Sequence, residues 1–206
     1  MHIYAFGSIC RGEIDQGSDV DLLACTDDAA PNIDLQKYSL YGYARLRKIW
    51  NEGNPFAWHL HLESKLIYSS DCNDFLASLG SPSKYNAATS DCEKFRKLFD
   101  EAYKSLIHSP NSSTFHLSCI FLSIRNLATC YSLNAGRPIF SRRSPLMISP
   151  ALLIEPEAFE VLTRARILST RGYGTQLTEK EINLTTSAVS VVPAWMESLV
   201  EQLRDE

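Results

Sequence analysis

The sequence contains no run that approaches the roughly 18 apolar residues of a membrane-spanning helix, so we expect no membrane association. It also lacks an excess of positive charge, because 20 Lys and Arg residues stand against 24 Asp and Glu residues and give a net charge of −4. That balance does not indicate nucleic acid as a partner. The first residues, MHIYAFGS, show no signal-peptide pattern, and we expect a cytoplasmic protein.

Closely spaced cysteine pairs are missing as well, although the chain has six cysteines. Without Cys-x-x-Cys spacing a zinc site is disfavoured, and without a secretory signal reduced thiols are favoured over disulfides. There is no internal repeat and no low-complexity segment. With 45% hydrophobic and 21% charged residues, the 206-residue chain has an ordinary globular composition, long enough for one large or two small domains.

One stretch is chemically distinctive, namely residues 6–23, which read FGSICRGEIDQGSDVDLL. A short strand predicted over residues 2–6 ends at Gly7-Ser8.

Two aspartates open the next predicted strand, residues 19–25. Alternation of side chains along a strand puts Asp19 and Asp21 on the same face. Neighbouring carboxylates repel each other unless a cation lies between them, and hard oxygen ligands suit Mg²⁺. The pattern therefore predicts a Mg²⁺ site at Asp19 and Asp21.

Taken together, these motifs resemble the signature of the nucleotidyltransferase superfamily that includes DNA polymerase beta and the minimal nucleotidyltransferases. In that signature an apolar residue and Gly-Ser are followed, after a spacer, by two acids that alternate with apolar residues. The matching pieces are Phe6-Gly7-Ser8, Arg11-Gly12, Gly17-Ser18 and Asp19-Val20-Asp21-Leu22.

The resemblance implies a function and a set of site residues. A nucleoside monophosphate would pass from an NTP, with ATP as the first candidate, to a hydroxyl of a small molecule, a protein or RNA. Asp19 and Asp21 would be catalytic and would bind one or two Mg²⁺ ions. The nucleotide-binding residues would be Gly7, Ser8, Arg11 and Ser18.

The family usually has a third carboxylate on a later strand. We expect a strand over residues 56–62, where the central position of the apolar pattern is His61 and Glu63 follows on the same face. Three alternatives remain open. Glu63 is the third catalytic acid, His61 acts as the base, or the site has lost this group.

Helical patterns account for most of the remaining chain. The helices are expected from Asp34 to about Glu52, after a cap at Asp71, after a capping box at 90–93, over about 113–135, over 156–170, and from a capping box at Thr178 onward with a kink or break at Pro193. Strands followed by helices predict an α+β fold. We expect a small mixed-sheet nucleotidyltransferase domain over residues 1–82 and an all-α antiparallel helical bundle over residues 83–206.

A second, looser resemblance lies in the long helix. Arg125-Asn126 resembles the start of the R-N-x-x-x-H motif of HEPN bundles, which often accompany minimal nucleotidyltransferases, but Cys130 stands at the His position. Cysteine cannot replace imidazole in RNA cleavage, so a HEPN-like module would serve the acceptor side or regulation. The loop at 137–150 carries three arginines that would contact the triphosphate or an acceptor, or only solvent.

Two function classes follow from these resemblances. The first is the Mg²⁺-dependent enzyme, with an NTP and an acceptor of unidentified class as partners, and a homodimer is compatible with it. The alternative is a catalytically weakened nucleotide- or partner-binding protein of toxin–antitoxin type.

Overall fold

The computed structural model describes residues 1–13, 20–28, 33–34 and 36–205. Contacts divide the chain into two compact units, Met1–Asn86 and Ala87–Glu206. The predicted α+β class is confirmed, because a mixed sheet with helices is followed by a helical region. The domain boundary expected after residue 82 stays a prediction.

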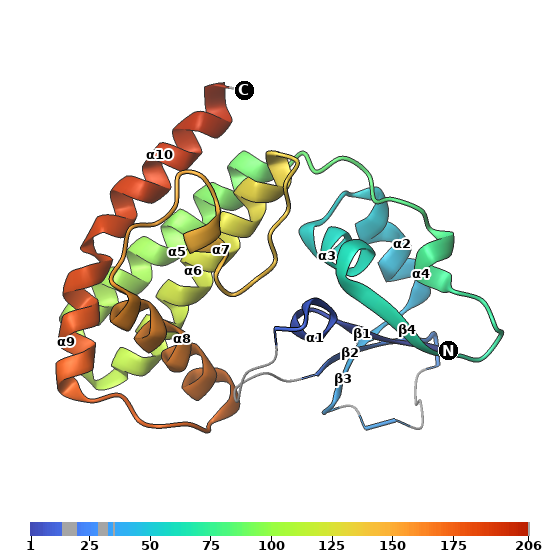
Figure 1. Ribbon diagram of the computed structural model, residues 1–206, viewed down its shortest axis with the longest axis horizontal. Coiled ribbons are helices and arrows are strands. Elements are labelled where there is room, and N and C mark those ends of the chain that lie inside the picture. The colour runs from blue at the N-terminus through green and yellow to red at the C-terminus, as the bar shows by residue number, and fades with distance from the viewer. Residues whose placement is uncertain (14–19, 29–32, 35, 206) are drawn as a thin grey trace. The chain divides into compact units, whose positions relative to one another are not determined.

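Within the described residues, the sheet of the first unit has four strands in the order β3-β2-β1-β4 (Figure 1). Their bounds are β1 (His2–Phe6), β2 (Asp21–Cys25), β3 (Tyr38–Tyr41) and β4 (Ser64–Ser69). Strand β1 pairs antiparallel with both β2 and β4, whereas β2 and β3 are parallel. Alternation along β1 buries His2, Tyr4 and Phe6 on one face of the sheet.

Helices cover that buried face. They are α2 (Tyr43–Asn51), α3 (Pro55–Glu63) and α4 (Phe75–Ser78), whereas the short helix α1 (Ser8–Arg11), which has no buried residue, follows directly after β1. The core of this unit joins Tyr4 and Phe6 of β1 to apolar side chains of α2, α3 and α4, among them Trp50, Leu60 and Phe75.

Two elements predicted for this unit are wrong, and one helix cap is misplaced. Residues 56–62 form helix α3 and not a strand, because Asn54 caps the helix by accepting a hydrogen bond from the Phe56 amide at 2.9 Å and Pro55 takes a first-turn position. The helix expected from Asp34 to Glu52 is instead strand β3 followed by α2. The short helix α4 is capped by Asp74 rather than Asp71.

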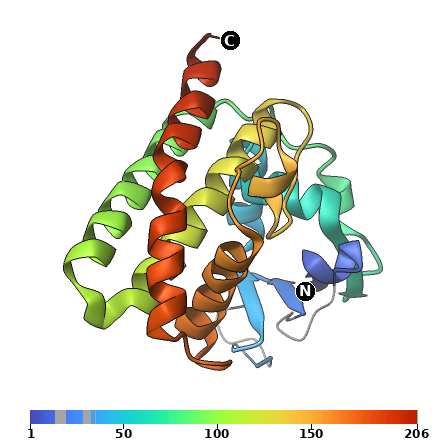
Figure 2. The ribbon, with the colours of Figure 1, turned by 60° about the vertical axis from the view of Figure 1, so that its left-hand side comes forward.

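Helices and two 3₁₀ turns make up the regular structure described in the second unit. They are α5 (Ala88–His108), η1 (Pro110–Ser112), α6 (Ser113–Asn134), α7 (Ser144–Met147), α8 (Pro156–Arg171), α9 (Glu179–Ala188), η2 (Val189–Val191) and α10 (Val192–Asp205). Helices α5 and α6 form a hairpin, and α10 runs beside them (Figure 2). No helix of the described residues combines the length and the apolar character needed to cross a membrane.

The helix signals of this unit are mostly confirmed. Gly136 follows α6 with φ of 72°, Pro156 begins α8, and Thr178 forms a capping box with Glu181. The chain breaks before Pro193 through η2. The capping box expected at Ser90 is wrong, because α5 already begins at Ala88.

Candidate active site

The end of β1 lies beside the starts of β2 and β4, at one end of the sheet. Antiparallel pairing sets Phe6, the last residue of β1, opposite Asp21 at the start of β2 and opposite Ser64 at the start of β4. Gly7 therefore leaves β1 beside Asp21 and beside Glu63, the residue that precedes β4. The Gly7 amide donates a hydrogen bond of 3.0 Å to the Glu63 carbonyl.

Gly7 makes room for the carboxylate of Asp21. A Cβ atom at position 7 would lie 3.0 Å from Asp21 Oδ2 and 3.8 Å from the His59 ring, so close that the carboxylate would have to shift by a few tenths of an ångström. The backbone of Gly7 has φ of 77° and ψ of −138°, a conformation that residues other than glycine rarely adopt. Asp21 is exposed, and α1 begins at Ser8 directly after this turn.

Glu63 is enclosed by two basic side chains. Its Oε2 atom accepts a hydrogen bond from Arg11 Nη1 and lies 3.0 Å from His59 Nε2. Arg11 also donates through Nη2 to Glu13 Oε2 at 2.9 Å. Burial lowers the pKa of Arg11, but the hydrogen bond to Glu13 and the charges of Glu63 and Glu13 outweigh burial, so that its pKa is raised and the guanidinium stays charged.

The helical conformation of α3 separates Glu63 from His61, the two candidates for the third catalytic group. Successive residues of a helix are 100° apart, so His59 and Glu63 share a face and His61 lies on another. The ring of His61 lies 5.9 Å from the ring of Trp58 and 3.4 Å, through Nε2, from Ser81 Oγ. Of these two candidates, the structure places Glu63 and not His61 beside the Gly7 turn.

His59 is the neighbour of the site that sequence reasoning missed. On the strand expected over residues 56–62, alternation would place His59 on the same face as His61 and Glu63, with nothing to single it out. Its spacing of four residues from Glu63 is the signal that could have found it, once the segment is read as a helix. Phe6 packs edge-on against its ring with centroids 5.7 Å apart.

Asp21 is the described residue best suited to hold a divalent ion. Its exposed carboxylate supplies the hard oxygen that Mg²⁺ prefers, and Gly7 leaves space beside it. Asp19 and Ser18 lie outside the described residues. Among the residues described, no group of three His, Cys, Asp or Glu side chains is arranged to hold a metal ion. The carboxylate of Asp21 is thus a ligand of the chemical type that Mg²⁺ binds.

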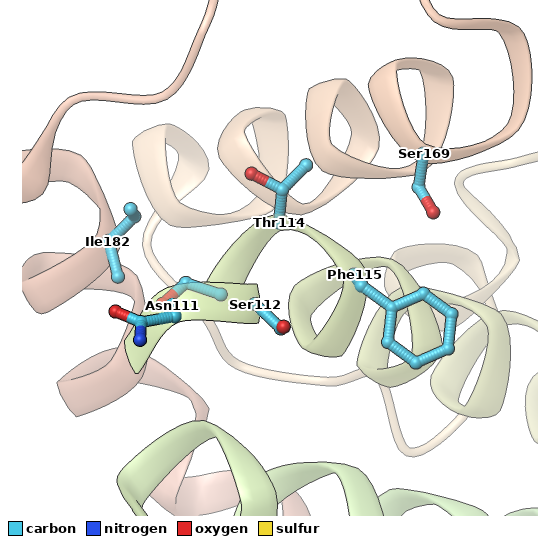
Figure 3. Close-up of a pocket in the computed structure, with 7 residues that line it drawn as sticks. Asn111, Ser112, Thr114, Phe115, Ser169 and Ile182 are labelled. Carbon is cyan, nitrogen blue, oxygen red and sulfur yellow. The ribbon is translucent and has the colours of Figure 1, made fainter. Parts of the chain in front are cut away.

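A separate hollow lies in the second unit, at the start of α6. Thr114, Ser169 and Ile182 reach it from helices α6, α8 and α9, and its volume is about 410 Å³ (Figure 3). Asn111, Ser112, Ser113 and Phe115 complete the lining. None of these side chains is charged, so the hollow offers neither a metal ligand of carboxylate type nor a cation for a triphosphate.

Comparison with known proteins bears on the first unit. No curated protein and no solved structure matches the chain. The HEPN-like assignment of the helical region is not confirmed by a family match. Residues 2–79, from β1 through α4, match the model of a family described as nucleotidyltransferase domain. That family generally uses divalent metal ions, and the domain implies an NTP substrate. The match supports assignment of this part of the chain to the nucleotidyltransferase superfamily, with nucleotidyl transfer as its general function.

Proposed function

We propose that the protein is a Mg²⁺-dependent nucleotidyltransferase that transfers a nucleoside monophosphate from an NTP, with ATP as the first candidate, to a hydroxyl group. The observation that carries this proposal is the position of Asp21 Oδ2, which lies close against the Gly7 turn, 3.0 Å from where a Cβ atom at position 7 would be. An exposed carboxylate beside the turn from β1 into α1 is a suitable place for a cation and the phosphates bound to it.

In the proposed site, different residues bind the metal ion and the phosphates. Asp21, together with Asp19, would hold the metal ion, which when bound neutralises charge on the triphosphate. Gly7 lets the backbone come close to the phosphates, and the hydroxyls of Ser8 and Ser18 and the guanidinium of Arg11 donate to their oxygens. The acceptor oxygen forms a bond to the alpha-phosphorus, the bond to pyrophosphate breaks, and the hydroxyl proton is lost to a base.

The helical unit is proposed to act on the acceptor side or in regulation. Arg125, which begins the HEPN-like motif, donates through Nη2 to the Phe140 carbonyl at 2.9 Å, and Thr129 Oγ1 donates to the Ile139 carbonyl at 3.2 Å. These contacts fix the arginine-bearing loop at 137–150 onto α6. The side chain of Cys130 is buried, which favours a structural use of this motif over RNA cleavage.

The alternative, a binding or regulatory protein of toxin–antitoxin type, also draws on a specific observation. The carboxylate of Glu63, the candidate third acid, is already bound by Arg11 and His59. A nucleotidyltransferase site without a third carboxylate able to act as ligand or base would bind nucleotide and turn over slowly.

Nucleotide transfer tests the proposal. The protein is incubated with Mg²⁺ and each NTP labelled in its alpha-phosphate, with the protein itself, bulk RNA and an aminoglycoside as acceptors. We expect the wild type to transfer label and an Asp19→Ala/Asp21→Ala variant to lose transfer. Equal transfer by the double variant contradicts the metal assignment, and failure of the wild type to bind any NTP favours the alternative.

A further inference from the structure

The carboxylate of Glu63 is tied to its surroundings more firmly than a metal ligand needs to be. Its side chain is 15% exposed, and both Arg11 and His59 contact the same Oε2 atom. Its backbone carbonyl also holds the Gly7 amide. A metal ion at Glu63 would compete with a guanidinium that is itself only 19% exposed and would leave that charge without its partner.

Arg11 is held by two carboxylates of unequal burial. Nη1 contacts Glu63, whose side chain is 15% exposed, whereas Nη2 contacts Glu13, whose side chain is 44% exposed. A guanidinium has five N–H donors arranged to match two oxygens of a carboxylate or a phosphate. A carboxylate in contact with Nη2 therefore occupies a position that suits a phosphate oxygen equally well.

Resting on the proposed function, we propose that Glu63 is a positioning residue that anchors Arg11 and is not a metal ligand. We further propose that Glu13 occupies the place on Arg11 that a phosphate oxygen of the triphosphate takes. Nucleotide binding then exchanges one anion for another at Nη2, while the contact of Nη1 with Glu63 persists.

Burial decides which carboxylate leaves. The Glu13 side chain is 44% exposed, so water solvates its carboxylate after separation, and the incoming phosphate oxygen replaces it beside the guanidinium. Removing the enclosed carboxylate of Glu63 from Arg11 leaves two poorly solvated charges, which is far less favourable. The two acids on one arginine thus have different tasks, and substituting them has different consequences.

The exchange is tested by equilibrium binding of ATP in the presence of Mg²⁺ to the full-length protein. We expect Glu13→Gln to lower the Kd about two- to fivefold, the range expected from removing a competing ion pair whose carboxylate is exposed. Glu52→Gln is the matched control, because Glu52 is also exposed and pairs with Lys48 at 3.8 Å in the same unit. Its Kd should equal that of the wild type.

A double-mutant cycle distinguishes the direct contact between Glu13 and Arg11 from a long-range electrostatic effect of the Glu13 charge on ATP binding. In an Arg11→Gln background, Glu13→Gln should no longer tighten ATP binding, because the contact it removes is already gone. An equal gain in both backgrounds would mean that the negative charge acts at a distance, and this would overturn the exchange. No gain in the wild-type background would overturn it as well.

The anchoring role is tested by Mn²⁺ as a probe for the metal site, with the free ion followed by electron paramagnetic resonance. We expect Glu63→Gln to leave the Mn²⁺ Kd within about twofold of the wild type, whereas Asp21→Asn raises it about tenfold or more. Equal losses in the two variants would make Glu63 a ligand and refute the anchor. If Glu63→Gln does not fold, the double-mutant cycle still decides the exchange.

These measurements distinguish a wrong nucleotidyltransferase assignment from a wrong exchange at Arg11. If the wild type binds neither Mn²⁺ nor ATP, the proposed function itself is wrong. If Asp21→Asn abolishes binding but Glu13→Gln and Glu52→Gln behave alike, the nucleotidyltransferase assignment stands and only the exchange on Arg11 is refuted.

Discussion

At the scale of single residues, Gly7 has the clearest physical role. Its backbone conformation disfavours any side chain, and a Cβ atom there would meet Asp21 Oδ2 at 3.0 Å. The residue therefore combines a sharp exit from β1 with space for the carboxylate. The Gly-Ser motif pointed to this position from the sequence, but the contact with Asp21 depends on strand pairing.

Gly7→Ala should lower the free energy of unfolding by about 1–3 kcal/mol through backbone strain and also displace Asp21. Gly136→Ala is the control, because Gly136 also has positive φ, at 72°, but a Cβ there meets nothing within 4 Å. Urea denaturation should show both variants destabilised, and only Gly7→Ala should weaken Mg²⁺-dependent ATP binding. Equal ATP binding by the two variants would contradict the role of Gly7.

The hydroxyl of Tyr4 is a second residue-scale feature with a measurable effect. It donates to Asp74 Oδ1 at 2.9 Å and accepts from the Leu76 amide at 3.0 Å, which ties β1 to α4. Burial raises the pKa of this phenol above its usual range, so the hydroxyl keeps its proton as a donor.

Tyr4→Phe leaves both partners without the hydroxyl and should cost about 1–3 kcal/mol of unfolding free energy. The control is Tyr68→Phe, since the side chain of Tyr68 is 46% exposed on β4. Chemical denaturation measures both. A loss for Tyr4→Phe no larger than that for Tyr68→Phe would mean that the buried hydroxyl contributes nothing.

At the scale of elements, helix α3 shows what a sequence pattern leaves undecided. Alternation of Trp58, Leu60 and Leu62 fits a strand, and only the Asn54-Pro55 start favours a helix. The choice changes the site, because a strand would place His61 and Glu63 on one face and the helix instead pairs His59 with Glu63. A local pattern could not decide this, since packing of Ala57 and Leu60 in the core stabilises the helix.

Helix α9 offers an element-scale test by pH. Glu181 closes the capping box with Thr178 and accepts a hydrogen bond of 2.5 Å from Arg164 on α8. The bond from Arg164, followed by those from Thr178, lowers the pKa of Glu181 to about 2. A carboxyl with a lowered pKa in the folded state stabilises the protein above its ordinary pKa and loses this contribution as pH falls toward 2.

The urea midpoint of the wild type should therefore fall between about pH 4.5 and pH 2 in part because of Glu181. Glu181→Gln should have a lower midpoint at neutral pH and a shallower decline over this interval. Glu179→Gln, on the same first turn of α9, is the control. Parallel pH curves for the wild type and Glu181→Gln would contradict the assignment.

At the scale of the whole molecule, the division into a first part with strands and a helical second part was predictable, because hydrophobic periods and caps are local, although β3 was missed and α3 was expected to be a strand. The α+β class, the long helix α6 and the capping box at Thr178 all follow from such local signals. The enclosure of Glu63 by Arg11 was not predictable, since it joins residues 52 positions apart through the pairing of β1 with β4. The resemblance to the nucleotidyltransferase superfamily, which the family match over residues 2–79 supports, needed only the motifs of residues 6–23.

The central claim is that Asp21 holds a divalent ion on which nucleotide binding depends. The most direct measurement is the Kd of ATP with Mg²⁺ and with excess chelator, for the wild type, Asp21→Asn and the control Asp100→Asn, an exposed aspartate on α5. The account predicts that the wild type and Asp100→Asn bind ATP only with Mg²⁺ and that Asp21→Asn weakens this binding at least about tenfold. ATP binding by Asp21→Asn that matches the wild type, with the same response to Mg²⁺, would contradict it.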